Sequence, residues 1–277
     1  MPVTTTPIGP TTGLEITGLH GGALVDRGVA GDCLAALERY GVVIYRDADV
    51  GDDDLVAFSR LLGEVVPLAM GGHERPEIQR ITRDASKSKL AAYREATFFW
   101  HIDGTTDTLP NKATLLTARQ VSDDGSGDTE FANTYAAFEE LPEEEKRELE
   151  KLRVVHSFAA SQLLVYPDPS PKERAAWDRV PSREHPLVWT RRSGRKSLLI
   201  GATAGEVVGR PAEEGRALLD RLLERATSPR FTIRHRWRPG DLVIWDNTGM
   251  LHRAQPYGEN SSRLMHRTSL AGEEEVR

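Results

Sequence analysis

The alternation of apolar and polar positions along the chain predicts short β-strands separated by a few helices. The clearest helix is expected at 211–226, where leucines recur on one face and charged residues lie mainly outside it. Residues 52–62 show a similar pattern and are followed by Gly63, a common residue just past a helix end. Further helices are expected at 29–40 and, broken around Pro142, at 134–152, with strands at 14–19, 42–45, 231–236, 241–245 and 263–270. By itself, this pattern indicates only a mixed, strand-rich chain that forms one domain.

Two segments have no strong period and are expected to be long loops. Residues 82–97 are polar and carry several arginines and lysines, and residues 162–183 contain four prolines. A long irregular segment in a compact domain is typically a lid, a binding loop or disorder, and the alternative is a solvated surface loop. The acidic tail at 272–277 is expected to be frayed.

The segment His101-Ile-Asp103, followed far downstream by His252, is the main candidate for chemistry. Residues two apart on a strand point to the same face, so His101 and Asp103 converge if residues 98–103 are extended. Two histidines and one carboxylate on one face of a metal form the non-haem Fe(II) triad, which leaves other positions open. For the tripeptide alone, a strand histidine next to an aspartate that caps the following turn is the favoured interpretation. A short apolar strand and a polar loop that lead into His252 favour the metal interpretation.

Arg263 follows His252 by eleven residues, and the segment 256–262 between them is rich in turn formers. We expect the flanking stretches to pair as antiparallel strands, which would place residues 252 and 263 opposite one another. A guanidinium would then lie beside the metal, and arginine is the side chain best suited to bind a carboxylate through two parallel hydrogen bonds. The alternative is a surface charge on a strand.

Composition narrows the class of protein. The 36 lysines and arginines against 42 aspartates and glutamates give a net charge of −6, so no basic surface for nucleic acid is expected. The single cysteine, Cys33, excludes an internal disulfide, fits a reducing compartment and is expected to be a small buried residue of a helix. The first residues lack the pattern of a signal peptide, and no apolar run approaches the ~20 residues that span a bilayer. We therefore expect a cytoplasmic enzyme without a membrane or nucleic-acid partner.

Several motifs in a fixed order resemble one family of Fe(II)/2-oxoglutarate enzymes, that of taurine dioxygenase and 2,4-dichlorophenoxyacetate dioxygenase (TauD/TfdA). The second half is closer to the phenoxyacetate branch. The motifs are Trp100-His-Ile-Asp-Gly104, Gly127-Asp-Thr-Glu-Phe131, Ala136-Ala-Phe-Glu-Glu-Leu-Pro142, His185-Pro-Leu-Val188, Gly194-Arg-Lys-Ser-Leu-Leu-Ile-Gly201, Arg234-His-Arg-Trp-Arg-Pro-Gly-Asp-Leu-Val-Ile-Trp-Asp-Asn247, His252-Arg253 and Arg263-Leu-Met-His-Arg267.

The resemblance implies a mainly β fold with flanking helices, built on a double-stranded β-helix or jelly-roll core of the cupin type. Residues 1–277 would form a single domain in which 82–97 and 162–183 act as lids. Family members are commonly oligomers, so a homo-oligomer is expected.

The resemblance also implies roles for individual residues. His101, Asp103 and His252 would bind Fe(II). Arg263 would hold the distal carboxylate of the co-substrate 2-oxoglutarate, and Thr129 would donate a hydrogen bond to the same group. The remaining two candidates would contact substrate: Arg267 near the iron and the substrate anion, and Thr97 where taurine enzymes carry an asparagine.

The implied reaction is hydroxylation of a C–H bond of a small anionic substrate by O2, with release of succinate and CO2. Asp103 favours hydroxylation, since related halogenases have a small residue there. An aryloxyalkanoate or another carboxylate is the expected substrate, and a sulfonate or alkyl sulfate is the alternative. Thr97 speaks against taurine, and Arg191 replaces a histidine of the phenoxyacetate enzyme. Two other classes stay open: a catalytically silent binding protein on the same fold, and a zinc hydrolase that uses the same ligands.

Overall fold

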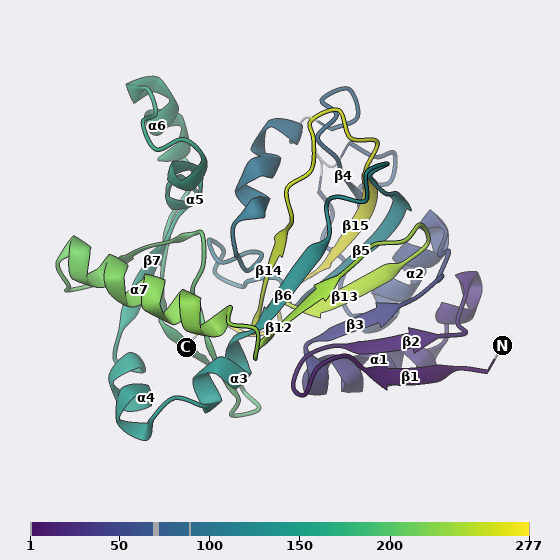
Figure 1. Cartoon of the computed structure of the whole chain (residues 1–277), viewed down its shortest axis with the longest axis horizontal. Coiled ribbons are helices and arrows are strands. Elements are labelled where there is room, and N and C mark those ends of the chain that lie inside the picture. The colour runs from purple at the N-terminus through teal and green to yellow at the C-terminus, as the bar shows by residue number, and fades with distance from the viewer. Residues whose placement is uncertain (1, 69–71, 89, 277) are drawn as a thin grey trace.

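The computed structural model describes residues 2–68, 72–88 and 90–276. Its centre is a pair of facing β-sheets, one of seven strands and one of three (Figure 1). The larger sheet runs in the order β1 (Thr4–Pro7), β2 (Leu14–Thr17), β3 (Val42–Tyr45), β13 (Leu242–Asp246), β5 (Ala113–Gln120), β15 (Leu264–Leu270) and β4 (Gln79–Ile81). The smaller sheet runs β12 (Thr232–His235), β6 (Thr129–Asn133) and β14 (Met250–Ala254). Only β2 and β3 pair in parallel within these two sheets.

Strand β13 shows how one sequence pattern supplies two cores. Ile244 packs among residues under helices α1 (Arg27–Tyr40) and α2 (Asp52–Leu62), which lie against the outer face of the large sheet. Val243 and Trp245 point the opposite way, into the core between the two sheets. Both sides of this strand are therefore buried, which explains its unbroken apolar sequence.

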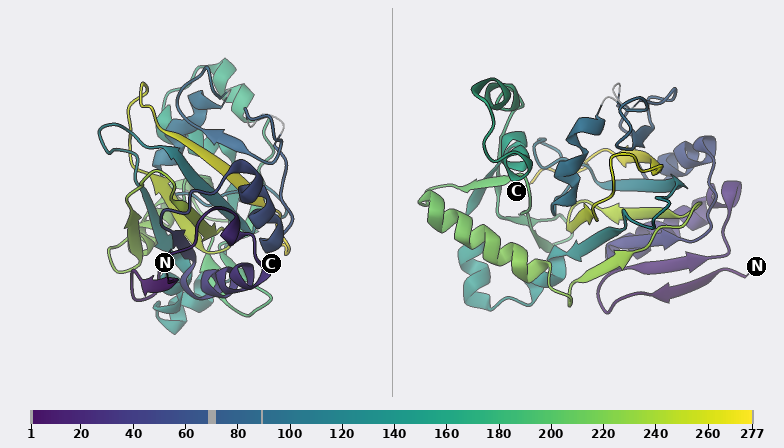
Figure 2. Two further views of the ribbon diagram at one scale, coloured as in Figure 1. Left: turned by 90° about the vertical axis from the view of Figure 1, so that its right-hand side faces the viewer. Right: turned by 45° about the horizontal axis from the view of Figure 1, so that its top comes forward.

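A third core forms at the other end of the molecule, away from β1 and β2 (Figure 2). It is built by the segment between β6 and β12, in which helix α7 (Ala212–Ala226) packs its leucines against small sheets. The other elements of this segment are α3 (Thr134–Glu139), α4 (Glu143–Leu149), β7 (Arg153–His156), α5 (Phe158–Val165), α6 (Pro171–Trp177), β8 (Arg183–Pro186), β9 (Val188–Thr190), β10 (Lys196–Leu198) and β11 (Ala204–Val207). Two short 3-10 helices, η1 (Gly21–Leu24) and η2 (Ala91–Phe98), lie outside it.

The expected fold class is confirmed: two facing, largely antiparallel sheets with helices outside form a jelly-roll core. Helix α2 has the predicted bounds, and the predicted break around Pro142 separates α3 from α4. Cys33 is buried and unpaired in α1, as expected.

The predicted antiparallel pairing around 256–262 is wrong. Strand β14 pairs with β6 in the small sheet, whereas β15 pairs with β5 and β4 in the large one. The turn formers lie in a connection that crosses from one sheet to the other. Residues 252 and 263 therefore approach the same space from opposite sheets rather than across a hairpin.

The predictions for the two long loops were also partly wrong. The segment 82–97 contains most of the 3-10 helix η2, and the residues 98–103 that follow it are not a strand, since only His101 among them forms an isolated bridge. The segment 162–183 contains α6, which begins with a capping box between Ser170 and Glu173. The Ser-Pro-Lys-Glu spacing was visible in the sequence and is a typical helix start. Both segments are therefore more ordered than their polarity suggested.

Candidate active site

His101, Asp103 and His252 meet where the chain that follows η2 crosses strand β14. Backbone hydrogen bonds in both directions, 3.0 and 2.9 Å long, pair His101 with His252 and hold their ring centroids 4.1 Å apart. The Nε2 atoms of His101 and His252 lie 3.9 and 3.7 Å from the carboxylate oxygens of Asp103. These distances exceed those of hydrogen bonds. The three ligand atoms all lie within 4.8 Å of one another, a spacing that could hold a metal ion.

The protonation states of the three side chains fit a divalent metal. Nδ1 of His101 lies 2.8 Å from the carbonyl oxygen of Phe99, so a proton donated there leaves Nε2 as a ligand. Burial lowers the pKa of His101, and it lowers the pKa of His252 to about 3, so both rings are neutral at pH 7. Burial acts to raise the pKa of Asp103, but Arg267 and the two imidazoles outweigh it and lower that pKa overall. The set is two neutral imidazoles and one carboxylate.

One cavity brings together six of the seven predicted site residues, and Asp103 adjoins it. Those six are Thr97, His101, Thr129, His252, Arg263 and Arg267. The cavity lies between the two sheets, since Thr129 and His252 belong to the small sheet and Arg267 to the large one. The guanidinium of Arg267 donates to Asp103 Oδ2 over 2.9 Å, so this arginine reaches the metal cluster directly.

Arg263 reaches the cavity from the residue before β15 and is only 2% exposed. Its guanidinium carbon lies 4.8 Å from the centre of the Tyr257 ring, and its Nε has no hydrogen-bond partner among the described residues. Gly127 gives it room: its φ is +85°, and a Cβ there would lie 2.9 Å from Cδ of Arg263. A buried cation without an acidic partner beside a candidate metal is suited to bind an anion.

The two threonines differ in what their hydroxyl groups can still do. The indole nitrogen of Trp237 donates to Thr129 Oγ1 over 2.9 Å, so the Thr129 hydroxyl proton stays available to a ligand. The Thr97 hydroxyl instead donates to the backbone carbonyl of Arg94 over 2.6 Å. Thr97 therefore lines the cavity as an acceptor and a small apolar surface, and not as a donor.

Among the lining residues that were not predicted, two carry polar groups that could contact a ligand, Arg94 and Tyr257. Arg94 belongs to the segment 82–97, which was expected to be a lid, but it had no assigned role there. No spacing rule identifies it, because its direction depends on the 3-10 helix η2 that the polar sequence did not predict. Tyr257 lies in the connection between β14 and β15, which was predicted as a simple hairpin turn.

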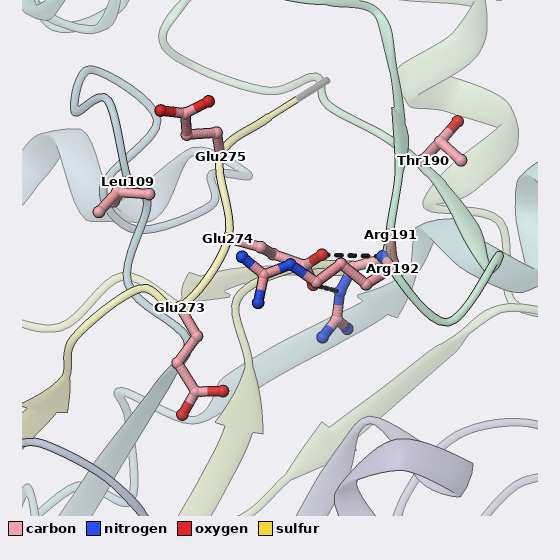
Figure 3. A pocket seen from close by; sticks show the side chains of 7 residues that line it. All are labelled: Leu109, Thr190, Arg191, Arg192, Glu273, Glu274 and Glu275. Atoms are coloured by element: carbon pink, nitrogen blue, oxygen red, sulfur yellow. Dashed lines mark hydrogen bonds and ion pairs between the residues drawn. The ribbon is translucent and has the colours of Figure 1, made fainter.

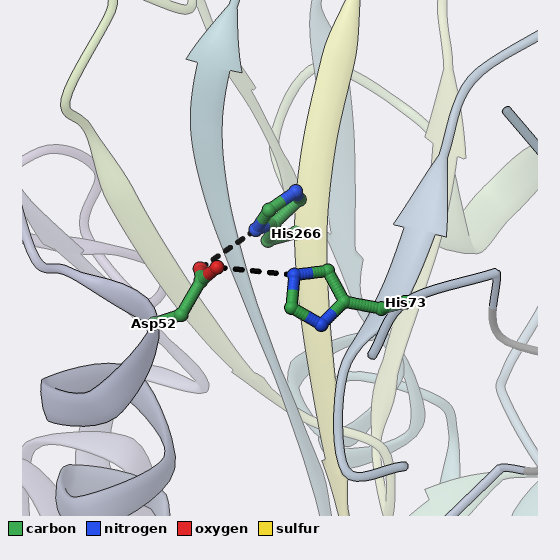
Figure 4. Close-up of side chains that lie close together, drawn as sticks. All are labelled: Asp52, His73 and His266. Carbon is green, nitrogen blue, oxygen red and sulfur yellow. Dashed lines mark hydrogen bonds and ion pairs between the residues drawn. The ribbon is translucent and has the colours of Figure 1, made fainter. Parts of the chain in front are cut away.

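A second cluster with the same residue types, Asp52, His73 and His266, lies beside helix α2 (Figure 4). Here the ligand atoms bond to one another: His266 Nδ1 lies 2.7 Å from Asp52 Oδ1, and His73 Nε2 lies 3.0 Å from Asp52 Oδ2. The backbone N–H of Arg75 donates to Nδ1 of His73 over 3.0 Å, so its proton is on Nε2. Arg119 donates to Asp52 over 2.5 Å and supplies the cation. The ligand atoms of this cluster are therefore engaged with one another and with Arg119.

A second cavity opens where the C-terminal tail crosses residues 190–192 (Figure 3). Glu274 bonds there to the side chain of Arg191 and to the backbone N–H of Arg192, and Lys112 bonds to Glu273 over 2.7 Å. The tail is therefore held at these residues, and the prediction of fraying was wrong for them. Arg191 lies outside the cavity between the sheets and supports the tail.

The comparisons with known proteins agree with this geometry. The family model for taurine catabolism dioxygenase TauD, TfdA family, matches residues 4–269. The alpha-ketoglutarate-dependent 2,4-dichlorophenoxyacetate dioxygenase of Burkholderia sp. (strain RASC) is 34% identical over 85% of this chain and 83% of its own length. The alpha-ketoglutarate-dependent sulfate ester dioxygenase of Pseudomonas putida is 30% identical over 96% and 89%. The crystal structure of AAD-2 in complex with Mn(II) and N-oxalylglycine superposes with a TM-score of 0.82 over both whole chains, at 29% identity.

Within the described part of the chain, no helix combines the length and the apolar character needed to cross a membrane.

Proposed function

The chain belongs to the TauD/TfdA family of dioxygenases, and from this premise we propose that it hydroxylates a C–H bond of a small aryloxyalkanoate or related carboxylate. It is an Fe(II)- and 2-oxoglutarate-dependent oxidoreductase that acts on an anionic substrate with O2. The observation that carries the proposal is the single cavity shared by the cluster His101, Asp103 and His252 and the unpaired Arg263.

In this proposal His101, Asp103 and His252 hold Fe(II) on one face. Bound iron, together with 2-oxoglutarate and O2, supplies the oxidising power that hydroxylates the substrate while 2-oxoglutarate becomes succinate and CO2. The chain's own contribution is to keep the two imidazoles neutral by burial and the carboxylate ionised through Arg267. The donor set of two nitrogens and one oxygen suits this metal.

Arg263 and Thr129 would bind the distal carboxylate of 2-oxoglutarate. Among the described residues no carboxylate forms an ion pair with the buried Arg263 guanidinium, whose Nε has no hydrogen-bond partner, and the Thr129 hydroxyl is free to donate because Trp237 donates to its oxygen. Anchoring the far end of a short dicarboxylate fixes the position of its other end. This pair would therefore set the direction in which 2-oxoglutarate enters the cavity.

Arg267 and Thr97 would lie against the substrate. Arg267 bonds to Asp103 through one of its nitrogens and has an unpartnered Nε, so it can bind an anion while it orients the carboxylate. The phenoxyacetate relative supports an aryloxyalkanoate. The sulfate ester relative, at 30% identity over nearly the whole chain, favours an alkyl sulfate as the second candidate.

The test is succinate formation from 2-oxoglutarate with Fe(II) and ascorbate, measured across aryloxyacetates, other small carboxylates, sulfonates and alkyl sulfates. We expect aryloxyalkanoates to stimulate succinate release, and His101→Ala to abolish it. Stimulation by alkyl sulfates alone would replace the substrate class. An iron-loaded protein that gives no succinate with any compound would favour a silent binding protein, and turnover of an ester with zinc but without 2-oxoglutarate would favour a hydrolase.

Two further assignments remain part of this proposal. Residues 1–277 would act as one domain, which the family match over residues 4–269 supports. The protein would also form a homo-oligomer, which sedimentation or light scattering of the purified chain would test.

A further inference from the structure

Arg94 lies in the cavity between the sheets, and no carboxylate among the described residues forms an ion pair with it. It belongs to η2, is only 7% exposed, and lines the same cavity as His101, Arg263 and Arg267. Its guanidinium makes one long hydrogen bond, 3.4 Å, to the backbone carbonyl of Arg80. Its Nε has no partner among the described residues. A cation buried in this way is unfavourable unless an anion joins it.

Another arginine of the same segment shows what a purely structural guanidinium looks like here. Arg83 bonds to Glu95 over 2.7 Å, to Glu259 over 3.2 Å and to the carbonyl oxygen of Tyr257 over 2.7 Å. Arg83 thus has its counter-ions within the protein, whereas Arg94 does not. Arg83 therefore fastens this segment to the protein, whereas Arg94 lines the cavity.

The charged side chains of the cavity favour an anion as the ligand of Arg94. Its pKa is lowered to about 10, first by burial and then by repulsion from Arg267, with Arg263 contributing less. Arg94, Arg263 and Arg267 line the same cavity, so three guanidiniums share it. Asp103 is the only carboxylate of the described site, and it already serves Arg267 and the candidate metal. With Arg263 assigned to 2-oxoglutarate and Asp103 bonded to Arg267, Arg94 is left to bind a further anion.

We propose that Arg94 and Arg267 together form a clamp for the carboxylate of the substrate, with Arg94 supplied by η2 directly before the first metal ligand. The inference rests on the proposed function and names the group that selects an anionic substrate at that site. Two guanidiniums that line one cavity can bind a carboxylate by charge and by paired hydrogen bonds. Because η2 leads directly into the segment that carries His101, a substrate bound by Arg94 would be held at a fixed position relative to the metal.

The first test is binding of phenoxyacetate, its uncharged amide and hexyl sulfate to protein loaded with Mn(II) and N-oxalylglycine, by calorimetry. Arg94→Met should weaken phenoxyacetate roughly 10- to 100-fold, because a charge-assisted contact is lost. It should leave the amide and N-oxalylglycine within about twofold. Lys87→Met is the matched control, since it removes one positive charge from the same segment at an exposed side chain paired with Asp84.

The second readout is the stability of the ligand-free protein. Arg94→Met should raise Tm by roughly 2–4 °C, because it removes a buried unpaired charge and keeps the volume. A structural arginine would lower Tm instead. Equal weakening of phenoxyacetate and its amide, unchanged phenoxyacetate binding, or failure of the wild-type protein to bind either anion would each overturn the clamp. Succinate release by the wild-type enzyme would show that the dioxygenase stands even where the clamp fails.

Discussion

The two clusters of two histidines and one aspartate lie on opposite faces of β15. Arg267 of this strand bonds to Asp103 in the cluster between the sheets, and the neighbouring His266 belongs to the cluster beside α2. In the first cluster the imidazole nitrogens stay 3.7 and 3.9 Å from Asp103. In the second, each oxygen of Asp52 already lies within 3.0 Å of a histidine nitrogen. We call these the inner cluster (His101, Asp103, His252) and the outer cluster (Asp52, His73, His266).

The difference shows that residue types do not define a metal site. In the outer cluster the proton on His73 and the charge of Arg119 fill the places that a metal would take. In the inner cluster burial keeps the imidazoles neutral, and their nitrogens lie 3.7 and 3.9 Å from Asp103, beyond hydrogen-bond distance. The same three residue types are therefore a hydrogen-bonded brace on one face of β15 and a ligand set on the other.

The largest expected effect is loss of metal from the inner cluster. Asp103→Ala removes a proposed ligand and should weaken Fe(II) binding by more than the roughly 10- to 100-fold that outer-shell changes cost. Succinate formation should fall to background. Metal content and turnover of the purified variant check this, with Asp53→Asn as a control at an exposed acid of α2. An Asp103→Ala protein that keeps its iron and its activity would contradict the assignment.

The next effect compares two arginines: Arg263, which lines the cavity beside the inner cluster, and Arg119, which bonds to Asp52 of the outer cluster. Arg263→Lys should raise KM for 2-oxoglutarate by roughly 10- to 100-fold, because lysine loses the paired hydrogen bonds of a guanidinium. Arg119→Lys should leave this KM unchanged, since Arg119 bonds to Asp52 and to the carbonyl oxygen of Val50, outside the cavity. Steady-state kinetics with varied 2-oxoglutarate decide the matter. Equal KM values in both variants would remove Arg263 from the co-substrate site.

The pH dependence of folding tests whether the inner cluster is held neutral. The folded pKa of His252 is about 3, below the roughly 6.5 of an unfolded histidine. The unfolded state therefore binds more protons below pH 6.5, and the free energy of unfolding should fall as pH drops toward 3. One such imidazole gives a slope of about 1.4 kcal/mol per pH unit. Urea denaturation of the metal-free protein should show this slope reduced in His252→Gln, and an unchanged slope would contradict it.

Sequence patterns predicted the parts of the fold that depend on local periodicity. Helix α2 and the buried strand β13 followed from apolar spacing, and the fold class and the inner cluster followed from a resemblance carried by ordered motifs. The hairpin around 256–262 failed because the choice of partner strand depends on packing between sheets, which turn formers do not encode. The outer cluster was missed for the same reason, since Asp52 is brought to β15 by the docking of α2, and His73 by the segment that leads into β4.

The smallest expected effect follows from loss of the hydrogen bonds within the outer cluster. Asp52→Asn removes the charge that Arg119 and the two histidines share, and should lower the free energy of unfolding by about 1–2 kcal/mol, since the carboxylate is 31% exposed. Iron content and KM for 2-oxoglutarate should match the wild type, because this cluster lies on the other face of β15 from Arg267. Urea denaturation and metal analysis, again beside Asp53→Asn, measure both quantities. A variant that lost iron at unchanged stability would make the outer cluster a metal site and would end the distinction between the two faces.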